Sequence, residues 1–190
     1  LRVPAGPALL GRVVSALGES LDGEDLPTAS AARPLFREAP SIMERAPVWR
    51  QVCTGMKAID TMIPLGHGQR ELIIGDRMTG KTSLALDAIL SQRGKNVRCI
   101  YCSIGQAHQK LRHVTHLLRE HHAAEYTVVV AALASHEASE QFLAPFAACA
   151  IGEQFMEEGN DVLVVFDDLS KHAWAYRQLS LLLELPPGRE

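Results

Sequence analysis

The sequence lacks the features of a membrane-spanning, secreted or nucleic-acid-binding chain. No apolar run in its 190 residues approaches the roughly 20 residues needed to cross a bilayer, and no basic head with an apolar middle marks a secretory signal. The formal charge of −3 gives no sign of a surface for a polyanion. Trp49 and Trp174 are isolated, and nothing resembles the aromatic interleaving that stacks bases. Nucleic acid is therefore not an expected partner.

Cysteine is also scarce, with four in the chain. Cys99 and Cys102 form a C-x-x-C pair, which is compatible with a metal or redox site. The pair lies within a predicted strand, however, where positions three apart point to opposite faces. With no second pair and no secretory context, the pattern favours buried free thiols in a reducing compartment.

The length is sufficient for one domain with a substantial core. An apolar fraction of 47% and a charged fraction of 22% are typical of a soluble globular protein. The chain begins at Leu1 rather than Met and closes on a Pro-Pro-Gly-Arg-Glu run. We therefore expect a fragment of a longer protein.

The most informative stretch is ELIIGDRMTGKTS, residues 71–83. An apolar run leads into Gly75, and Gly80, Lys81 and Thr82 follow after four residues, which is the G-x-x-x-x-G-K-T spacing of a phosphate-binding P-loop. Small residues let backbone N–H groups converge on an anion, and a helix beginning near Lys81 adds the positive end of its dipole. The Lys81 ammonium can reach the outer phosphates, and the Thr82 hydroxyl can ligate Mg²⁺. The alternative is a glycine-containing turn without a ligand, which is disfavoured because a strand is expected before the motif, at residues 72–74, and a helix after it.

From this stretch onward, predicted helices and strands alternate. The pattern predicts helices at residues 81–92, 108–121, 139–158 and 169–183, and strands at residues 97–104, 127–132 and 162–166. The strands are not amphipathic, which is typical of a parallel sheet covered by helices on both faces. Ligands of such sheets bind beyond the carboxyl ends of the strands.

The first 50 residues carry less information. Residues 1–26 contain short apolar segments broken by glycine and an Asp22-Gly23 turn signal, which predicts β-rich or irregular structure. Residues 27–50 contain Pro34, Pro40 and Pro47, and we expect an extended crossing segment that packs on something else.

A second part of a nucleotide site follows the apolar run at residues 162–166. Asp167 is the first acid after this run, as in a Walker B strand, and is expected to face the Mg²⁺ held by Thr82. The alternative is an aspartate that caps the next helix, a role that suits Asp168 better.

Hydrolysis would also need a group that polarises the attacking water. The natural place is the end of the strand expected to neighbour the P-loop strand, where this chain has Gln106. A neutral amide can hydrogen-bond a water but is not a useful base. The sequence therefore predicts a site that holds Mg-nucleotide and cleaves it poorly.

The histidines also suggest a metal site. His113 and His116 lie three apart on a predicted helix and could chelate an ion. They share a face with charged residues, opposite the apolar stripe, so a solvated face is the favoured interpretation.

Together these residues resemble the alpha subunit of rotary F-type ATP synthases. The resemblance is carried by residues 54–60, GQRELIIGDRMTGKTS at 68–83, CIYCSIGQ at 99–106, EYTVVVAA at 125–132, QFLAPFAACA at 141–150, VFDDLS at 165–170 and YRQLSLLLELPPGRE at 176–190. The catalytic beta subunit has a different loop and a glutamate where Gln106 stands. The terminator Rho and the flagellar export ATPases share the core but not the Gly-Asp-Arg-x-Thr-Gly-Lys-Thr wording.

The resemblance implies an α/β, RecA-like P-loop NTPase domain at residues 27–190, truncated at its carboxyl end. Residues 1–26 would be the end of an amino-terminal β-barrel and a linker. The domain would bind ATP or ADP with Mg²⁺ without turning it over, in a hexameric ring with beta subunits around a central stalk. This places it peripherally on the cytoplasmic face of a bacterial inner membrane, or the mitochondrial or chloroplast equivalent. The arginine supplied to the beta site would lie beyond this chain.

The resemblance also implies residue roles, none of them catalytic. It assigns nucleotide contacts to Gly75, Asp76, Arg77, Met78, Thr79, Gly80, Lys81, Thr82, Ser83 and Gln106, and Mg²⁺ to Thr82 and Asp167. Two departures stand out: the family usually has glutamine where Met78 stands, and a basic pair where this chain has Ala107 and His108.

Two further functions stay open. One is a self-sufficient P-loop motor, such as an export ATPase or a Rho-like translocase, whose base would be a residue such as Glu153 or Glu157. The other is a scaffold that is too truncated to bind nucleotide.

Overall fold

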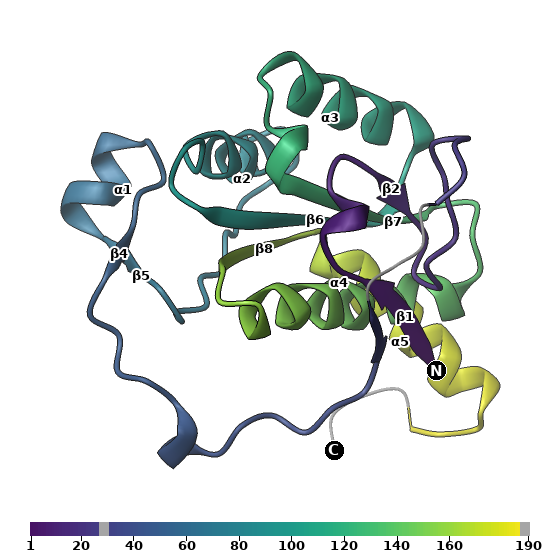
Figure 1. The fold of residues 1–190 in the computed structure, drawn as a ribbon. Coiled ribbons are helices and arrows are strands. Elements are labelled where there is room, and N and C mark those ends of the chain that lie inside the picture. The colour runs from purple at the N-terminus through teal and green to yellow at the C-terminus, as the bar shows by residue number, and fades with distance from the viewer. Residues whose placement is uncertain (27–30, 187–190) are drawn as a thin grey trace.

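Runs of β-branched and other apolar residues form a four-stranded parallel sheet in the computed structural model, which describes residues 1–26 and 31–186 (Figure 1). The strand order is β2 (Val13–Val14), β7 (Thr127–Leu133), β6 (Val97–Gln106) and β8 (Asp161–Asp167). All three pairings are parallel. The predicted α/β class and the three predicted strands are confirmed.

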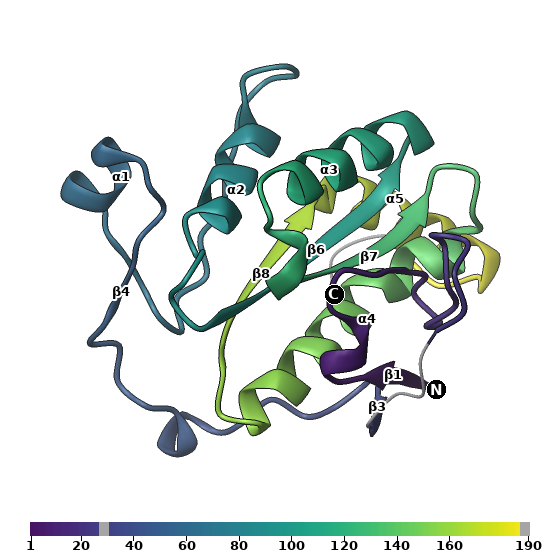
Figure 2. The same ribbon diagram turned by 45° about the horizontal axis from the view of Figure 1, so that its top comes forward.

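Four helices cover the sheet, two on each face (Figures 1 and 2). On one face lie α2 (Lys81–Leu90) and α3 (His108–Glu120), and on the other lie α4 (Ala138–Glu157) and α5 (Leu169–Leu182). These bounds agree with the predicted helices to within a few residues. In the described part of the chain, none of the helices is both long and apolar enough to cross a bilayer.

The alternation of side chains along β6 divides the core into two clusters. Ile100, Cys102 and Ile104 pack toward α4, while Cys99 and Tyr101 pack toward α2 and α3. Both cysteines are buried and free. The prediction that the C-x-x-C sulfurs point to opposite faces is confirmed.

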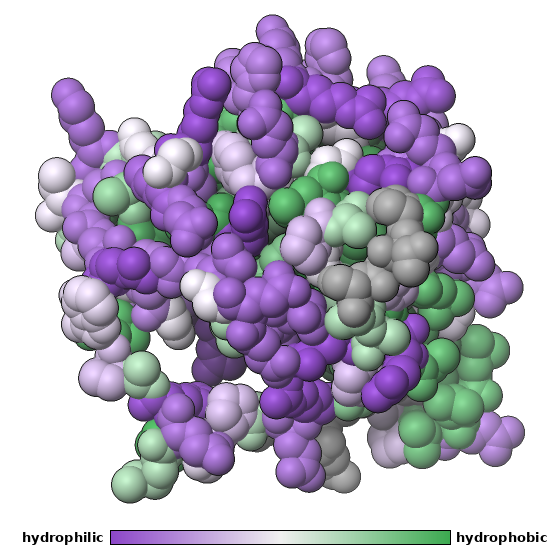
Figure 3. All heavy atoms as spheres, viewed as in Figure 1, coloured by the Kyte–Doolittle hydropathy of each residue, from purple (hydrophilic) through white to green (hydrophobic). Residues whose placement is uncertain are grey.

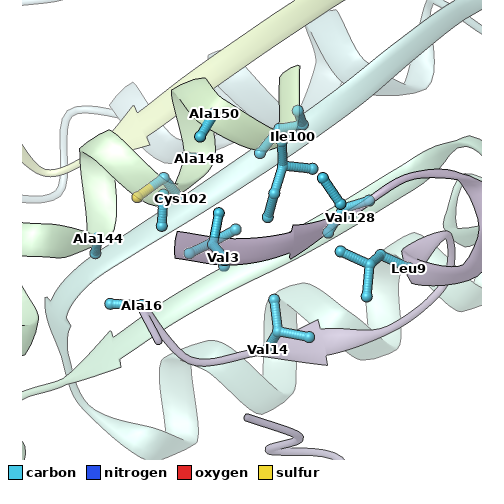
Figure 4. Close-up of a cluster of buried hydrophobic side chains, with 14 of the residues drawn as sticks. Val3, Leu9, Val14, Ala16, Ile100, Cys102, Val128, Ala144, Ala148 and Ala150 are labelled. Carbon is cyan, nitrogen blue, oxygen red and sulfur yellow. The ribbon is translucent and has the colours of Figure 1, made fainter. Parts of the chain in front are cut away.

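The first residues of the chain contribute to the same core. β1 (Arg2–Ala5) pairs antiparallel with β3 (Ala31–Pro34), and η1 (Pro7–Leu9) follows β1. Val3, Leu9 and Val14 are fully buried beside residues of β6, β7 and α4 (Figure 4). The division of the chain at residue 27 stays a prediction, because residues 27–30 lie outside the described residues.

An extended, exposed segment leads from β3 to the P-loop (Figure 1). It contains η2 (Ile42–Glu44), β4 (Gln51–Val52), α1 (Lys57–Met62) and β5 (Leu65–Gly66). Of the extended segment predicted at residues 27–50, the described residues 31–50 are extended apart from the turn at η2. Its Trp49 is 82% exposed, so the tip of the segment does not pack on the described core. Residues 187–190 of the closing run also lie outside the described residues.

The strand predicted at residues 72–74 is wrong for this structure. The segment is irregular, and its Leu72 and Ile74 are 64% and 82% exposed. An apolar run becomes a strand only where a neighbouring strand satisfies its backbone groups. Among the described strands, β8 pairs with β6 alone, and no ladder reaches residues 72–74.

The turn after β2 is held by one carboxylate. The Arg12 guanidinium donates to both Asp22 oxygens, from Nε at 2.8 Å and from Nη2 at 2.7 Å. The Val13 backbone N–H and the Ser20 hydroxyl also donate to Asp22, at 3.0 and 2.8 Å. The hydrogen bond from Arg12 is the main reason that the pKa of Asp22 lies well below its ordinary value, although burial opposes it.

We predict that Asp22→Ala lowers the free energy of unfolding at pH 7 by about 3 kcal/mol, because it leaves the Arg12 guanidinium without its carboxylate partner and with backbone carbonyls alone. Asp25→Ala is the matched control, since Asp25 is exposed and accepts from Arg12 through its backbone oxygen. Urea unfolding measures both.

The same comparison should depend on pH. Because the folded pKa of Asp22 is depressed, its contribution is complete above its unfolded pKa and is lost as pH falls toward the folded value. The difference between wild type and Asp22→Ala should therefore shrink below about pH 4. A difference that is constant between pH 7 and pH 3 would contradict this assignment.

Candidate functional site

The P-loop residues form an exposed turn that ends at the first residue of α2. Gly80 precedes α2 with φ of 88°, a left-handed conformation that glycine adopts without strain. The Lys81 ammonium folds back into the loop, where Nζ donates to the Gly75 carbonyl at 2.6 Å and also to the Asp76 carbonyl. The loop therefore curls around a positive charge.

The loop backbone passes so close to the Thr79 side chain that the first position of the motif needs glycine. A Cβ added to Gly75 would lie 2.8 Å from Thr79 Oγ1. The Thr79 hydroxyl is itself held by the Asp76 carbonyl at 2.8 Å. Asp76, Arg77 and Met78 are exposed. A tight loop around a lysine ammonium fits a phosphate group, which needs converging donors and positive charge.

A contact between two distant segments joins the P-loop to the sheet. Thr82, in the first turn of α2, donates through Oγ1 to Asp167 Oδ2 at 2.9 Å. Asp167 is the last residue of β8. The structure thus brings together the two residues predicted to hold Mg²⁺. Hydroxyl and carboxylate oxygens are ligands that Mg²⁺ accepts, so this pair fits the ion.

Three further side chains surround the Asp167 carboxylate. The Tyr101 hydroxyl and the Lys110 ammonium donate to Oδ2 at 2.6 and 2.9 Å, and Gln106 Nε2 donates to Oδ1 at 3.3 Å. Burial alone would raise the pKa of Asp167, but the hydrogen bonds from Tyr101, Lys110 and Thr82 outweigh burial and hold it below its ordinary value. Burial and the negative charge of Asp167 raise the pKa of Tyr101, so its phenol stays a donor.

Gln106 reaches this cluster because β6 is irregular at its end. The register with β7 shifts between Ile104 and Gln106, and Gly105 lies between them with φ of 60°. A Cβ at Gly105 would lie 2.7 Å from Gln141 Oε1 and 3.0 Å from Lys171 Cβ, so the bend needs glycine for space as well. Beyond the bend, Gln106 Nε2 lies 3.3 Å from Asp167 Oδ1 and 3.2 Å from Asp168 Oδ2.

Comparison with known proteins shows which family has a sequence of this kind. Residues 55–190 match the family model for the ATP synthase alpha/beta family, nucleotide-binding domain. This chain belongs to the ATP synthase alpha/beta family. Over all 190 residues it is 54% identical to "ATP synthase subunit alpha" of Thioalkalivibrio sulfidiphilus, and over 188 residues, 99% of the chain, 56% identical to the protein of that name in Dehalococcoides mccartyi.

A third relative, "ATP synthase subunit alpha" of Clostridium botulinum, is 55% identical over the whole chain. The resemblance to alpha subunits inferred from the motifs is confirmed. The chain spans 37–38% of the length of these curated relatives.

The two adjacent acids after the β8 apolar run have different contacts. Asp167 faces Thr82, while Asp168 is the N-cap of α5 and accepts from the Lys171 backbone N–H at 2.9 Å. The capping role assigned to Asp168 is confirmed.

Sequence reasoning missed Tyr101 and Lys110. Tyr101 reads as one more apolar residue of β6, and its hydroxyl meets Asp167 only because β6 and β8 are neighbours in the sheet. Lys110 lies four residues after Gln106, which places it in the first turn of α3. The sequence around these two residues gave no signal of either contact, because both contacts depend on β8 lying beside β6.

The acids considered as a base for a self-sufficient motor, and the histidines considered as a metal site, lie outside the Asp167 cluster. Glu157 pairs with Arg33 and Arg37, and Glu153 also lies 3.7 Å from Arg37. These acids tie α4 to β3 and to the segment that follows it, and they are not part of the Asp167 cluster. His113 and His116 are exposed on α3, as the solvated-face interpretation predicts.

We predict that Gln106→Glu lowers the free energy of unfolding at pH 7 by about 2 kcal/mol. The change replaces a donor to two carboxylates with a third negative charge, so a hydrogen bond is lost and repulsion is gained. Gln109→Glu is the control, because it adds the same charge three residues away at an exposed position. Urea unfolding of both variants measures the effect, and an equal stability of the two would contradict the predicted role of the Gln106 amide.

Proposed function

We propose that this chain is the nucleotide-binding region of an ATP synthase alpha subunit and that it binds ATP or ADP with Mg²⁺ without hydrolysing it. The observation that carries the proposal is the contact of 2.9 Å between Thr82 and Asp167, which unites a P-loop and a Walker B carboxylate at the carboxyl end of the parallel sheet. The names of the relatives that match 99–100% of this chain support the same function.

In this proposal the loop residues receive the phosphates. Gly75 to Ser83 would contact the phosphates through backbone N–H groups, and the Lys81 ammonium would exchange its two loop carbonyls for phosphate oxygens. Thr82 and Asp167 would hold Mg²⁺, which supplies charge neutralisation when it is bound. The Thr82 hydroxyl has lone pairs free for an ion while its proton points to Asp167.

The surroundings of Gln106 support retention rather than cleavage. A base must accept a proton from water, and the Gln106 amide cannot. The two acids beside it are engaged elsewhere: the pKa of Asp167 is depressed by its donors, and Asp168 caps α5. Neither carboxylate is therefore suited to act as the base.

The proposal extends to the assembly. We infer that the complete subunit alternates with beta subunits in a ring around a central stalk, and that this ring is attached peripherally to an ion-translocating membrane sector. An exposed apolar patch at the end of α5 supports a protein partner, because monomers rarely expose large contiguous apolar areas. It consists of Leu181, Leu182, Leu183 and Leu185 (Figure 3).

We predict that Lys81→Ala weakens Mg-ATP binding by the complete subunit roughly a hundredfold. The variant loses a charge-assisted contact to phosphate worth about 3 kcal/mol. Equilibrium titration with a fluorescent ATP analogue measures the affinity. Lys95→Ala is the control, since Lys95 is an exposed cation beyond the other end of α2.

The same proteins also test whether bound ATP is retained without hydrolysis. Bound ATP should stay intact for hours, as measured by chromatography of the extracted nucleotide. Steady turnover by the wild-type subunit that disappears in Lys81→Ala would overturn the non-catalytic assignment and favour a self-sufficient P-loop motor.

A further inference from the structure

The hydrogen-bond donors around the Asp167 carboxylate are unevenly divided between its two oxygens. A carboxylate offers about four lone-pair positions. Thr82, Tyr101 and Lys110 donate to Oδ2, and Gln106 donates to Oδ1. Oδ2 thus has more donors than its share of about two lone-pair positions, so a cation that binds Oδ2 beside Thr82 must displace one of them.

The four donors differ in how easily they can be displaced. Tyr101 is buried in the core and 1% exposed, so its phenol would lose its hydrogen bond without gaining water. Thr82 can keep its hydrogen bond and still offer oxygen lone pairs to a metal ion. The Lys110 side chain is 36% exposed and ends a flexible four-carbon stem, so its ammonium can move into water.

Charge identifies Lys110 as the donor that competes with a metal. Its ammonium lies 2.9 Å from Asp167 Oδ2, whereas the Asp167 side chain is only 12% exposed. Two cations at one poorly exposed carboxylate repel each other more strongly than they would in water. The uncharged donors Thr82, Tyr101 and Gln106 exert no such repulsion.

We propose that Lys110 is a resident counter-cation of Asp167 that competes with a divalent cation and so sets the metal affinity of the site. This inference deepens the metal role proposed above for Thr82 and Asp167. It makes Lys110 a positioning residue: it holds the carboxylate charged and in place, and its ammonium must leave before a metal ion binds Asp167 Oδ2 beside Thr82.

The test is a titration of the complete subunit with Mn²⁺ alone, with free Mn²⁺ followed by electron paramagnetic resonance. Asp167→Asn in the same titration defines the binding that does not depend on this carboxylate. Lys110→Met, which removes the charge and keeps the length and helix propensity of the side chain, should tighten the Asp167-dependent binding about tenfold. Lys110→Gln, which keeps a donor, should change the affinity in the same direction.

Two controls separate charge from structure. Lys110→Arg keeps the positive charge and should bind Mn²⁺ as the wild type does. Arg119→Met removes a charge from an exposed position further along α3 and should also leave the affinity unchanged. Unchanged or weaker Mn²⁺ binding by Lys110→Met and Lys110→Gln overturns the inference, and so does tighter binding by Lys110→Arg.

The outcome is separable from that of the proposed function. If ATP binds and depends on Lys81 while Mn²⁺ affinity is indifferent to Lys110, only the counter-cation role fails. If Lys110→Met tightens Mn²⁺ binding but no variant binds ATP, the nucleotide assignment fails and the competition at Asp167 stands.

Discussion

The hydrogen bond between Thr82 and Asp167 is the contact on which the site depends. It joins the start of α2 to the end of β8, two points 85 residues apart in the sequence. The P-loop before α2 is exposed and irregular, so its own contacts do not fix it to the sheet. The helix start is positioned by the packing of Leu86 and Ile89 against the sheet and by this polar contact. A rigid core thus supports a phosphate loop that has few contacts of its own.

The local pattern of apolar residues in the sequence was sufficient to predict the three long strands, the four helices that cover the sheet and the α/β class. Continuous apolar runs predicted β6, β7 and β8, and helical periodicity predicted α2 to α5, because each element buries a face whose spacing is visible in the sequence. The adjacent acids Asp167 and Asp168 were also separable in advance, since one ends a buried strand and the other stands at a helix N-cap position.

What pattern could not predict depends on contacts between distant residues. Leu72 and Ile74 have the composition of a strand, but a strand forms only beside a partner, and the described sheet offers them none. Tyr101 and Lys110 reach Asp167 because β6 is next to β8 and α3 begins where β6 ends. Neither fact is written in the residues around Tyr101 or Lys110. The fold was therefore more predictable from the sequence than the contacts of Tyr101 and Lys110 with Asp167.

The position of β2 has a consequence for the synthesis of the chain. Val14 is fully buried only when it pairs beside Val130. On the ribosome, residues 1–16 emerge long before β7 exists, so their apolar side chains stay exposed while the central part of the domain is translated. Contacts of such high sequence separation slow folding. Residues 1–16 are consequently exposed apolar sequence to which chaperones have access during translation.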